Sequence, residues 1–170
     1  QEQGYKPPVV ICKGNGFTES AYLESVGNHA NGIIVATEFV VGTKGDDINA
    51  KYKEKYGEDF NGHSAEAYTT AWVVIDALKN IVDGGGEISR ESIQQELKEI
   101  KIEGQFSNGN EIILPYDTIA FEEDEFNGTP YLNQNLNATL TVTQIEDGVY
   151  VPIWPYDIAQ ADVVYPATYE

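Results

Sequence analysis

The sequence predicts an α/β protein, and three features of the 170-residue chain support this fold class. Within residues 9–36, an apolar strand, a glycine-rich turn, a short helix and a second apolar strand follow one another. That order is typical of a parallel α/β unit. Three helical segments come next, and an antiparallel hairpin lies near the end of the sequence.

The first α/β unit is predicted element by element. Val9–Cys12 is a short buried strand, and it ends at Lys13–Gly16, where two glycines allow positive φ. Thr18 is the expected N-cap of a two-turn helix that stops at Gly27. Gly32–Ala36 is the second strand.

The middle of the chain is predicted to be helical. A helix that begins at Asp46 carries apolar residues at four-residue spacing and stops before Gly57. The segment Ser64–Val82 is apolar nearly all round, so we expect a core helix that is buried on most sides. A third helix runs from Ser89 to about Ile100.

Short β segments are expected after Lys101. Ile112–Leu114 and Ile119–Phe121 are predicted as strands, and the acidic run Glu122–Glu125 is predicted, with Asn127-Gly128, as a solvated polar turn.

The last regular element is the clearest one. Residues 139–154 alternate between apolar and polar types on both sides of Asp147-Gly148, which predicts a hairpin. Two parallel strands and one hairpin are too few for a doubly wound sheet, and a parallel sheet is normally covered on both faces. We therefore infer that other chain segments complete this structure.

Composition excludes several functions. The chain has 28 acidic and 10 basic residues, for a formal net charge of -18. Nucleic acids and anionic membranes are bound through Lys and Arg, so neither is an expected partner. The single cysteine, Cys12, lies in an apolar strand and is interpreted as a small buried hydrophobe.

Catalytic and metal-binding motifs are weak. His29 and His63 have no second ligand at metal-binding spacing, and the glycine clusters lack the context of a phosphate loop. Glu122–Glu125 lacks the spacing of a calcium loop. We expect no metal, no cofactor and no enzymatic activity.

Position in the fold gives the best site candidates. Phe17 follows the glycine turn after the first strand, and His63 precedes the long apolar helix. Ligands of open α/β sheets bind beyond the carboxyl ends of strands, and helix N-termini present free N–H groups. The alternative, that both loops are ordinary turns, stays open.

The order of several motifs resembles a known family. These motifs are Asn31–Thr37, Tyr52–Gly57, Ala67-Tyr68 through Leu78, Ile119–Phe121 and Gln144–Pro155. Together with the strand, glycine turn and helix that precede them, they resemble the C-terminal half of type I periplasmic binding proteins. Within that family the similarity is to the branched-chain amino acid and amide group, the solute receptors of ABC importers.

The resemblance implies a two-lobed α/β fold of which this chain supplies the C-terminal portion. Residues 1–36 would belong to lobe 2, and residues 37–134 to lobe 1. Residues 135–157 would supply the C-terminal hairpin of lobe 2, and residues 158–170 would form an extended tail.

The resemblance also implies which residues bind the ligand. Asn15-Gly16 matches the loop in which amino-acid-binding members place an acidic residue against an ammonium group, and Phe17 follows it directly. The chain departs from that pattern, because Asn15 is a neutral donor and acceptor. His63 matches the position of an aromatic wall, where it could stack or hydrogen-bond.

The function implied is that of a periplasmic or extracellular solute-binding subunit, with an N-terminal lipid anchor left open. It would bind an amino acid, an amide or an aromatic acid by hinge closure between the lobes. Its partners would be a small-molecule ligand, a membrane permease and the N-terminal half of the receptor. An extracellular sensory or adhesive domain with the same fold is the alternative.

Overall fold

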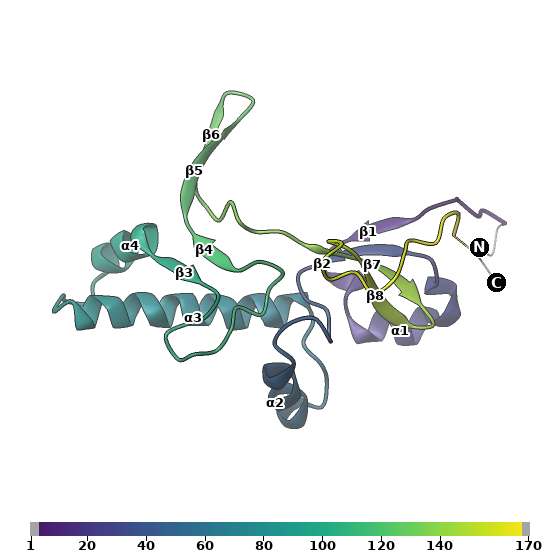
Figure 1. Ribbon diagram of the computed structural model, residues 1–170, viewed down its shortest axis with the longest axis horizontal. Coiled ribbons are helices and arrows are strands. Elements are labelled where there is room, and N and C mark those ends of the chain that lie inside the picture. The colour runs from purple at the N-terminus through teal and green to yellow at the C-terminus, as the bar shows by residue number, and fades with distance from the viewer. Residues whose placement is uncertain (1–3, 168–170) are drawn as a thin grey trace. The chain divides into compact units, whose positions relative to one another are not determined.

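The computed structural model describes residues 4–167 and divides the chain into two compact units (Figure 1). Unit 1 comprises Gln1–Ala65 and Leu140–Glu170, and unit 2 comprises Glu66–Thr139. The described residues form both helices and strands, as the predicted α/β class requires, so that class is confirmed. The lobe boundaries expected near residues 36 and 134 concern a complete receptor and stay a prediction.

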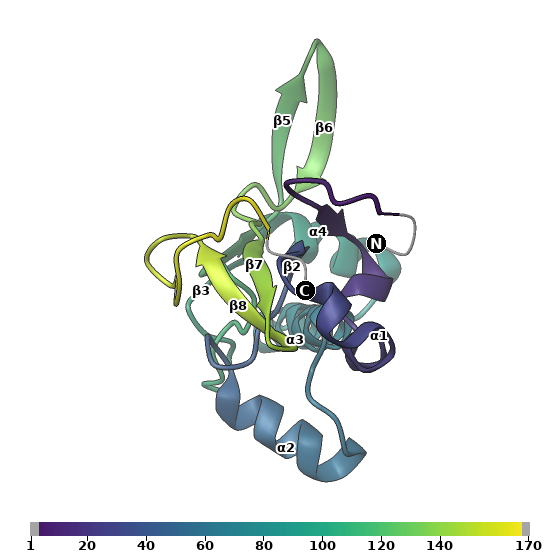
Figure 2. The same ribbon diagram turned by 90° about the vertical axis from the view of Figure 1, so that its right-hand side faces the viewer.

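Unit 1 is built on one four-stranded sheet of order β1-β2-β7-β8. Its strands are β1 (Ile11–Lys13), β2 (Ile34–Thr37), β7 (Thr141–Glu146) and β8 (Val149–Trp154). β1 and β2 are parallel, whereas β7 is antiparallel to both β2 and β8. Figure 2 shows β7 and β8 side by side in this sheet.

Within the described residues, four short helices belong to unit 1. They are η1 (Asn15–Phe17), α1 (Ser20–Val26), η2 (Gly27–Ala30) and α2 (Asp46–Tyr56), and the first three lie between β1 and β2 in the sequence. Three fully buried residues, Ala30, Val35 and Ile145, form a hydrophobic cluster, and partly buried side chains of η1 and α1 pack against it. Cys12 also packs there, and burial raises the pKa of its thiol, as expected of a structural cysteine.

The predicted cap of α1 is wrong by one residue. The N-cap is Glu19, not Thr18, and its side chain makes no capping hydrogen bond. The Glu19 carboxylate instead accepts a hydrogen bond from the side chain of Asn61, at 2.8 Å. The Glu19 side chain thus contacts a residue 42 positions away and does not cap α1.

Unit 2 contains the remaining elements. Apart from α3 (Gly62–Asp83), which begins in unit 1, they are α4 (Arg90–Glu99), β3 (Lys101–Glu103), β4 (Thr118–Ala120), β5 (Glu122–Phe126) and β6 (Thr129–Gln134). Its core joins one face of α3 to β3, β4 and the segment between them.

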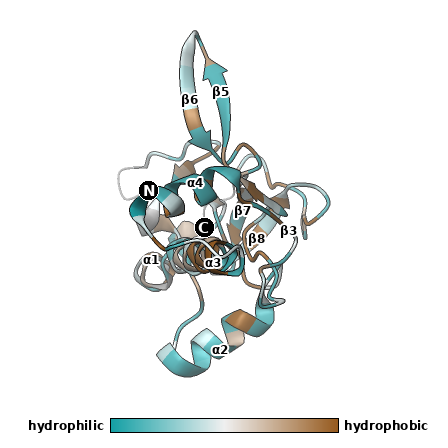
Figure 3. Ribbon diagram, turned by 90° about the vertical axis from the view of Figure 1, so that its left-hand side faces the viewer, coloured by the Kyte–Doolittle hydropathy of each residue, from teal (hydrophilic) through white to brown (hydrophobic). Residues whose placement is uncertain are grey.

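The expectation that α3 is buried on most sides is wrong within the described chain. Val73, Ala77 and Ile81 are buried, but Val74 and Ile75 are 38% and 44% exposed. The ribbon of α3 is largely hydrophobic, whereas that of α4 is mostly hydrophilic (Figure 3). Unit 2 packs against one face of α3, so apolar residues on the other face of the helix are exposed.

Two predicted β assignments are also wrong. Ile112–Leu114 is buried but irregular, because it packs into the core of unit 2 instead of pairing along a strand. Glu122–Glu125 is not a turn, because it lies in β5 and pairs with β6. The turn is confined to Asn127-Gly128, where both residues have positive φ. The predicted strand near Ile119 is confirmed as β4.

Elements with strong local signals are confirmed. α2 ends at Gly57, which has φ 85° as a left-handed C-cap. α4 begins with a capping box between Ser89 and Ser92, and the hairpin turns at Asp147-Gly148.

The segment that follows β8 is held to the sheet by one buried side chain. Gln144 is 1% exposed, donates to the carbonyl oxygens of Gly32 and Val164, and accepts from the Val164 N–H. The buried amide of Gln144 therefore makes three hydrogen bonds, and two of them hold the backbone of Val164 against the sheet.

No helix within residues 4–167 combines the length and the apolar character needed to cross a membrane.

We expect Gly148→Ala to lower the free energy of unfolding by about 1 kcal/mol, because Gly148 has φ 76° and a Cβ is disfavoured in the left-handed region. Urea unfolding measures the change. The matched control is Gly16→Ala, since neither site places other atoms within 4 Å of a new Cβ, and φ at Gly16 is outside that region. Equal losses in both variants would contradict this explanation.

We also expect added salt to stabilise the protein. With 28 acidic and 10 basic residues, most carboxylates have no cation to pair with, and their repulsion opposes folding. The thermal midpoint should rise between about 0.01 M and about 1 M NaCl, as the Debye length falls from about 30 Å to about 3 Å. KCl at equal ionic strength is the control, and a flat or falling midpoint would contradict the prediction.

Candidate functional site

The best candidate site in unit 1 lies where its two parallel strands end. β1 and β2 pair in register from Ile11 with Ile34 to Lys13 with Ala36. Because they are parallel, the residues that follow both strands lie at one edge of the sheet. We call this region the strand-end site and define it as Lys13, Asn15–Phe17, Thr37–Phe39 and Asn61–His63.

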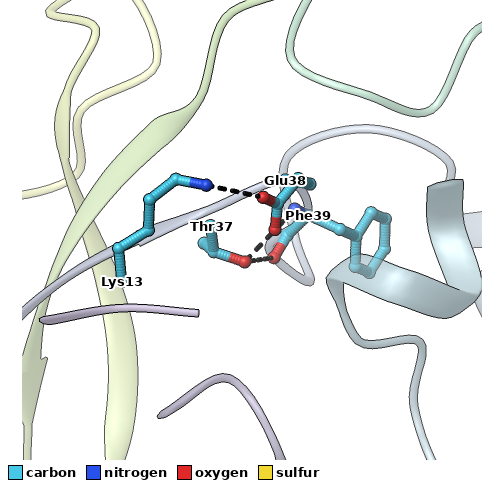
Figure 4. Close-up of polar contacts among 4 residues, drawn as sticks. All are labelled: Lys13, Thr37, Glu38 and Phe39. Carbon is cyan, nitrogen blue, oxygen red and sulfur yellow. Dashed lines mark hydrogen bonds and ion pairs between the residues drawn. The ribbon is translucent and has the colours of Figure 1, made fainter. Parts of the chain in front are cut away.

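An ion pair crosses the strand-end site from β1 to β2. The Lys13 Nζ lies 3.5 Å from the Glu38 Oε1, and the two side chains point toward one another (Figure 4). The side chain of Lys13 is 61% exposed, whereas that of Glu38 is 19% exposed. The carboxylate therefore belongs to the more buried side chain, and the ammonium belongs to the more solvent-exposed one.

The turn after β2 directs Glu38 into this position. The Thr37 hydroxyl donates to the Phe39 carbonyl oxygen at 3.1 Å and accepts from the Phe39 N–H at 3.4 Å (Figure 4). Thr37 is 2% exposed, so this local hydrogen bonding is shielded from water. Such side-chain-to-backbone bonds offer the backbone an alternative to strand pairing, which is consistent with the end of β2 at Thr37.

Glu38 also lies against the first residue of α3. A Cβ built on Gly62 would lie 2.5 Å from the Glu38 Oε2, so glycine leaves the space that the carboxylate uses. The N-terminus of a helix carries unpaired N–H groups and a partial positive charge, which favours a carboxylate there. Glu38 therefore joins the ends of β1 and β2 to the start of α3.

The start of α3 is capped and anchored by Asn61. Its Oδ1 accepts from the Ser64 N–H at 2.8 Å, and the Ser64 Oγ accepts from the Asn61 N–H at 2.9 Å. The Asn61 Nδ2 donates to Glu19 at the start of α1. One asparagine thus caps α3 and ties it to α1.

A second polar group positions the loop before α3. Asn49, on α2, is 5% exposed; it accepts from the Phe60 N–H at 2.7 Å and donates to Asp59 at 2.9 Å. Lys53 completes the group with an ion pair to Asp59 at 2.8 Å. These hydrogen bonds from Lys53 and Asn49 lower the pKa of the Asp59 carboxyl.

A cavity of about 450 Å³ lies beside the strand-end site, wholly within unit 1. It shares Thr37, Phe39 and Asn61 with the site. Its apolar walls include Leu23, Val40, Phe60 and Val149. The cavity has the size and the mixed lining of a small-molecule pocket.

The predicted ligand-binding residues lie as follows. Gly16 is exposed in η1, and His63 is exposed in the first turn of α3. Phe17 is half-buried, and its ring packs edge-on against Tyr22 at 5.3 Å. The side chain of Asn15 is outside the described part of the structure. The Asn15–Phe17 segment and the start of α3, which carries His63, are connected at this edge through Lys13, Glu38 and Gly62.

Sequence reasoning misses Lys13 and Glu38. The resemblance assigns Glu38 to lobe 1 and the predicted loop Asn15–Phe17 to lobe 2, which hides Glu38 as a partner of that loop. One signal could have identified it, because Glu38 is the first charged residue after a buried strand of a parallel pair.

The loop after β1 is held by Tyr150, on β8. The Tyr150 hydroxyl donates to the Phe17 carbonyl oxygen. Burial raises the pKa of Tyr150 to about 12, and nearby Tyr22 and Glu19 act in the same direction. The neutral phenol is the form that donates this hydrogen bond.

Metal-ligand chemistry finds no support among residues 4–167. No three His, Cys, Asp or Glu side chains in that range gather closely enough to hold a metal ion.

Comparison with known proteins identifies similar chains. The profile of a family described as periplasmic binding protein matches residues 1–131. The Leu/Ile/Val-binding protein homolog 7 of Brucella suis is 29% identical over 97% of this chain and 39% of its own length. Homolog 8 of Brucella abortus is 28% identical over 94% of this chain and 37% of its own length. The chain thus spans about two fifths of these relatives.

A solved structure has a similar fold. It comes from Silicibacter pomeroyi, and its protein is assigned as a branched-chain amino acid ABC transporter. The TM-score is 0.63 at 18% sequence identity, and the match covers 93% of this chain and 40% of that one.

We expect Tyr150→Phe to lower the free energy of unfolding by about 1 kcal/mol near pH 9, through loss of the hydrogen bond to Phe17. Because the pKa of Tyr150 is raised in the folded state, the wild type has its full stability advantage below about pH 10. It loses this advantage as the pH rises through about 12. Urea unfolding at several pH values measures the difference between the two proteins. Tyr156→Phe, at a tyrosine that is 86% exposed, is the control. An advantage that grows with pH would contradict the assignment.

Proposed function

The chain belongs to the periplasmic binding protein family, and from that premise we propose that it forms part of an extracytoplasmic solute-binding subunit of an ABC importer. The match of residues 1–131 to the family profile supports this proposal. The subunit would bind its solute without chemical turnover and deliver it to a membrane permease. The remaining part of the receptor would supply the rest of the ligand site.

The observation that carries the proposal is the convergence of polar groups at the carboxyl ends of β1 and β2. Glu38, Lys13 and the start of α3 meet there, next to a cavity of about 450 Å³. Open α/β sheets bind small molecules at such an edge, and a few convergent polar groups beside apolar walls give specificity.

We propose that unit 1 contacts the solute through Asn15, Gly16, Phe17 and His63, together with Glu38. The backbone of η1 and the exposed ring of His63 present donors and acceptors at the edge. Glu38 adds a carboxylate that could bind the ammonium of an amino acid or the N–H of an amide. The carboxylate of an aromatic acid would pair with the Lys13 ammonium and not with Glu38.

Release and capture of the solute would follow from hinge motion. In the two-lobed fold that the resemblance implies, the chain passes between the lobes near residues 36 and 134, so these two connections would bend when the receptor closes. Hinge closure of this kind encloses a ligand and can expose a different surface to a partner.

We expect Glu38→Gln to weaken binding of a cationic or amide solute about tenfold, because it removes a charge-assisted hydrogen bond. Isothermal titration of the complete receptor against leucine, an aliphatic amide and phenylacetate measures the affinity. Glu54→Gln, at an exposed residue of α2, is the matched control.

Gly62→Ala gives a second test of the same site. Its new Cβ would push the Glu38 carboxylate aside, while alanine is readily accommodated in a helix. The variant should weaken binding with little loss of stability. Absence of heat for all three solute classes would contradict the proposed function, and wild-type affinity in Glu38→Gln would contradict the role of Glu38.

A further inference from the structure

The cavity beside the strand-end site has an excess of negative charge in its walls. Within the described chain, its charged lining residues are Glu19, Glu24, Glu58 and Asp59, which carry carboxylates, and Lys53, which carries an ammonium. Glu19 and Glu24 belong to the start and the middle of α1, whereas Glu58 and Asp59 lie between α2 and α3. The negative charge thus comes from two segments of unit 1 that line the same space.

Existing contacts leave most of this charge unbalanced. The Lys53 ammonium pairs with Asp59 at 2.8 Å, and the Glu19 carboxylate accepts a hydrogen bond from the uncharged amide of Asn61. Glu24 and Glu58 form no ion pair within the described part of the chain. Both residues are exposed, so a ligand can reach their carboxylates from solvent.

Another part of the lining is apolar. Phe39, Val40 and Phe60 are 6%, 6% and 8% exposed, and the rings of Phe39 and Phe60 meet edge-on at 5.7 Å. Leu23 and Val149 also line the cavity. An aliphatic chain placed against these side chains is removed from water, which favours binding. The cavity therefore suits a molecule that is apolar along its length and positively charged at one end.

The cavity is continuous with the strand-end site. The two share Thr37, Phe39 and Asn61, and Glu38 lies between the first two of these residues in the sequence. The cavity volume is about 450 Å³, within the range of about 300–1,000 Å³ that is usual for small-molecule pockets. One small molecule can therefore contact Glu38 and the cavity together.

We propose that the solute is an amino acid with a long, positively charged side chain, such as lysine. This inference rests on the proposed function and specifies its solute. The α-ammonium and α-carboxylate would lie at the strand-end site, and the aliphatic part of the side chain would pack against the apolar lining. The distal ammonium would lie near Glu24 and Glu58, whose carboxylates attract it. A side chain that ends in a carboxylate would meet like charges and is disfavoured.

Three amino acids that differ at the end of the side chain test this assignment. L-lysine ends in an ammonium, L-norleucine in a methyl group and L-2-aminoadipate in a carboxylate, and each is titrated calorimetrically into the complete receptor. We expect lysine to bind about tenfold more tightly than norleucine, and aminoadipate to bind most weakly.

The outcomes separate this inference from the proposed function. Norleucine bound as tightly as lysine would overturn the inference and leave the proposed function standing. Absence of heat from these three amino acids, and also from an aliphatic amide and phenylacetate, would overturn the proposed function and the inference with it.

Variants locate the distal ammonium. Glu24→Gln and Glu58→Gln should each weaken lysine binding about threefold, because each removes one exposed charge. The double variant should weaken it about tenfold and leave norleucine unchanged, whereas a disturbed fold would weaken both ligands. Glu54→Gln, at an exposed residue of α2 outside the cavity lining, is the control. Wild-type lysine affinity in the double variant would place the ammonium elsewhere and overturn the inference.

Discussion

The carboxylate of Glu38 is the point at which three separate segments of unit 1 meet. It pairs with Lys13 at the end of β1, follows Thr37 at the end of β2, and lies against Gly62 at the start of α3. The Lys13–Glu38 contact needs the parallel pairing of β1 and β2, because antiparallel strands would place the two ends on opposite edges. Glu38 then links this pair of strands to the start of α3.

Hydrophobic burial and hydrogen bonds contribute differently to the site. The cluster of Ala30, Val35 and Ile145 fixes the sheet under α1, but hydrophobic contacts are non-directional and do not by themselves orient a loop. Asn61 and the buried Asn49 supply that direction, since their amide groups bind specific backbone N–H groups before and within α3. The start of α3, which carries His63, is therefore held by hydrogen bonds, as the Tyr150 hydroxyl holds η1, which carries Gly16.

The sequence could predict the elements whose signals are local. The glycine after α2, the serine cap of α4 and the Asp147-Gly148 turn each act within a few residues, and all three lie where expected. Failures occurred where a distant segment decides. Glu19, not Thr18, is the N-cap of α1, and its side chain bonds to Asn61. Ile112–Leu114 is apolar because it packs in the core of unit 2 and not in a sheet. The position of Glu38 in the site could not be predicted for the same reason, since it depends on Gly62, 24 positions away in the sequence.

The strength of the Lys13–Glu38 pair decides whether Glu38 is available to a solute. Its atoms are 3.5 Å apart, and the lysine side chain is 61% exposed. Exposed ion pairs contribute between about 0 and 1 kcal/mol, because solvent screens them and the lysine loses side-chain entropy. A ligand cation held by additional contacts can therefore displace the Lys13 ammonium at little cost. The net charge of -18 attracts cations without selecting among them, so in the proposed site selection would rest on the geometry around Glu38.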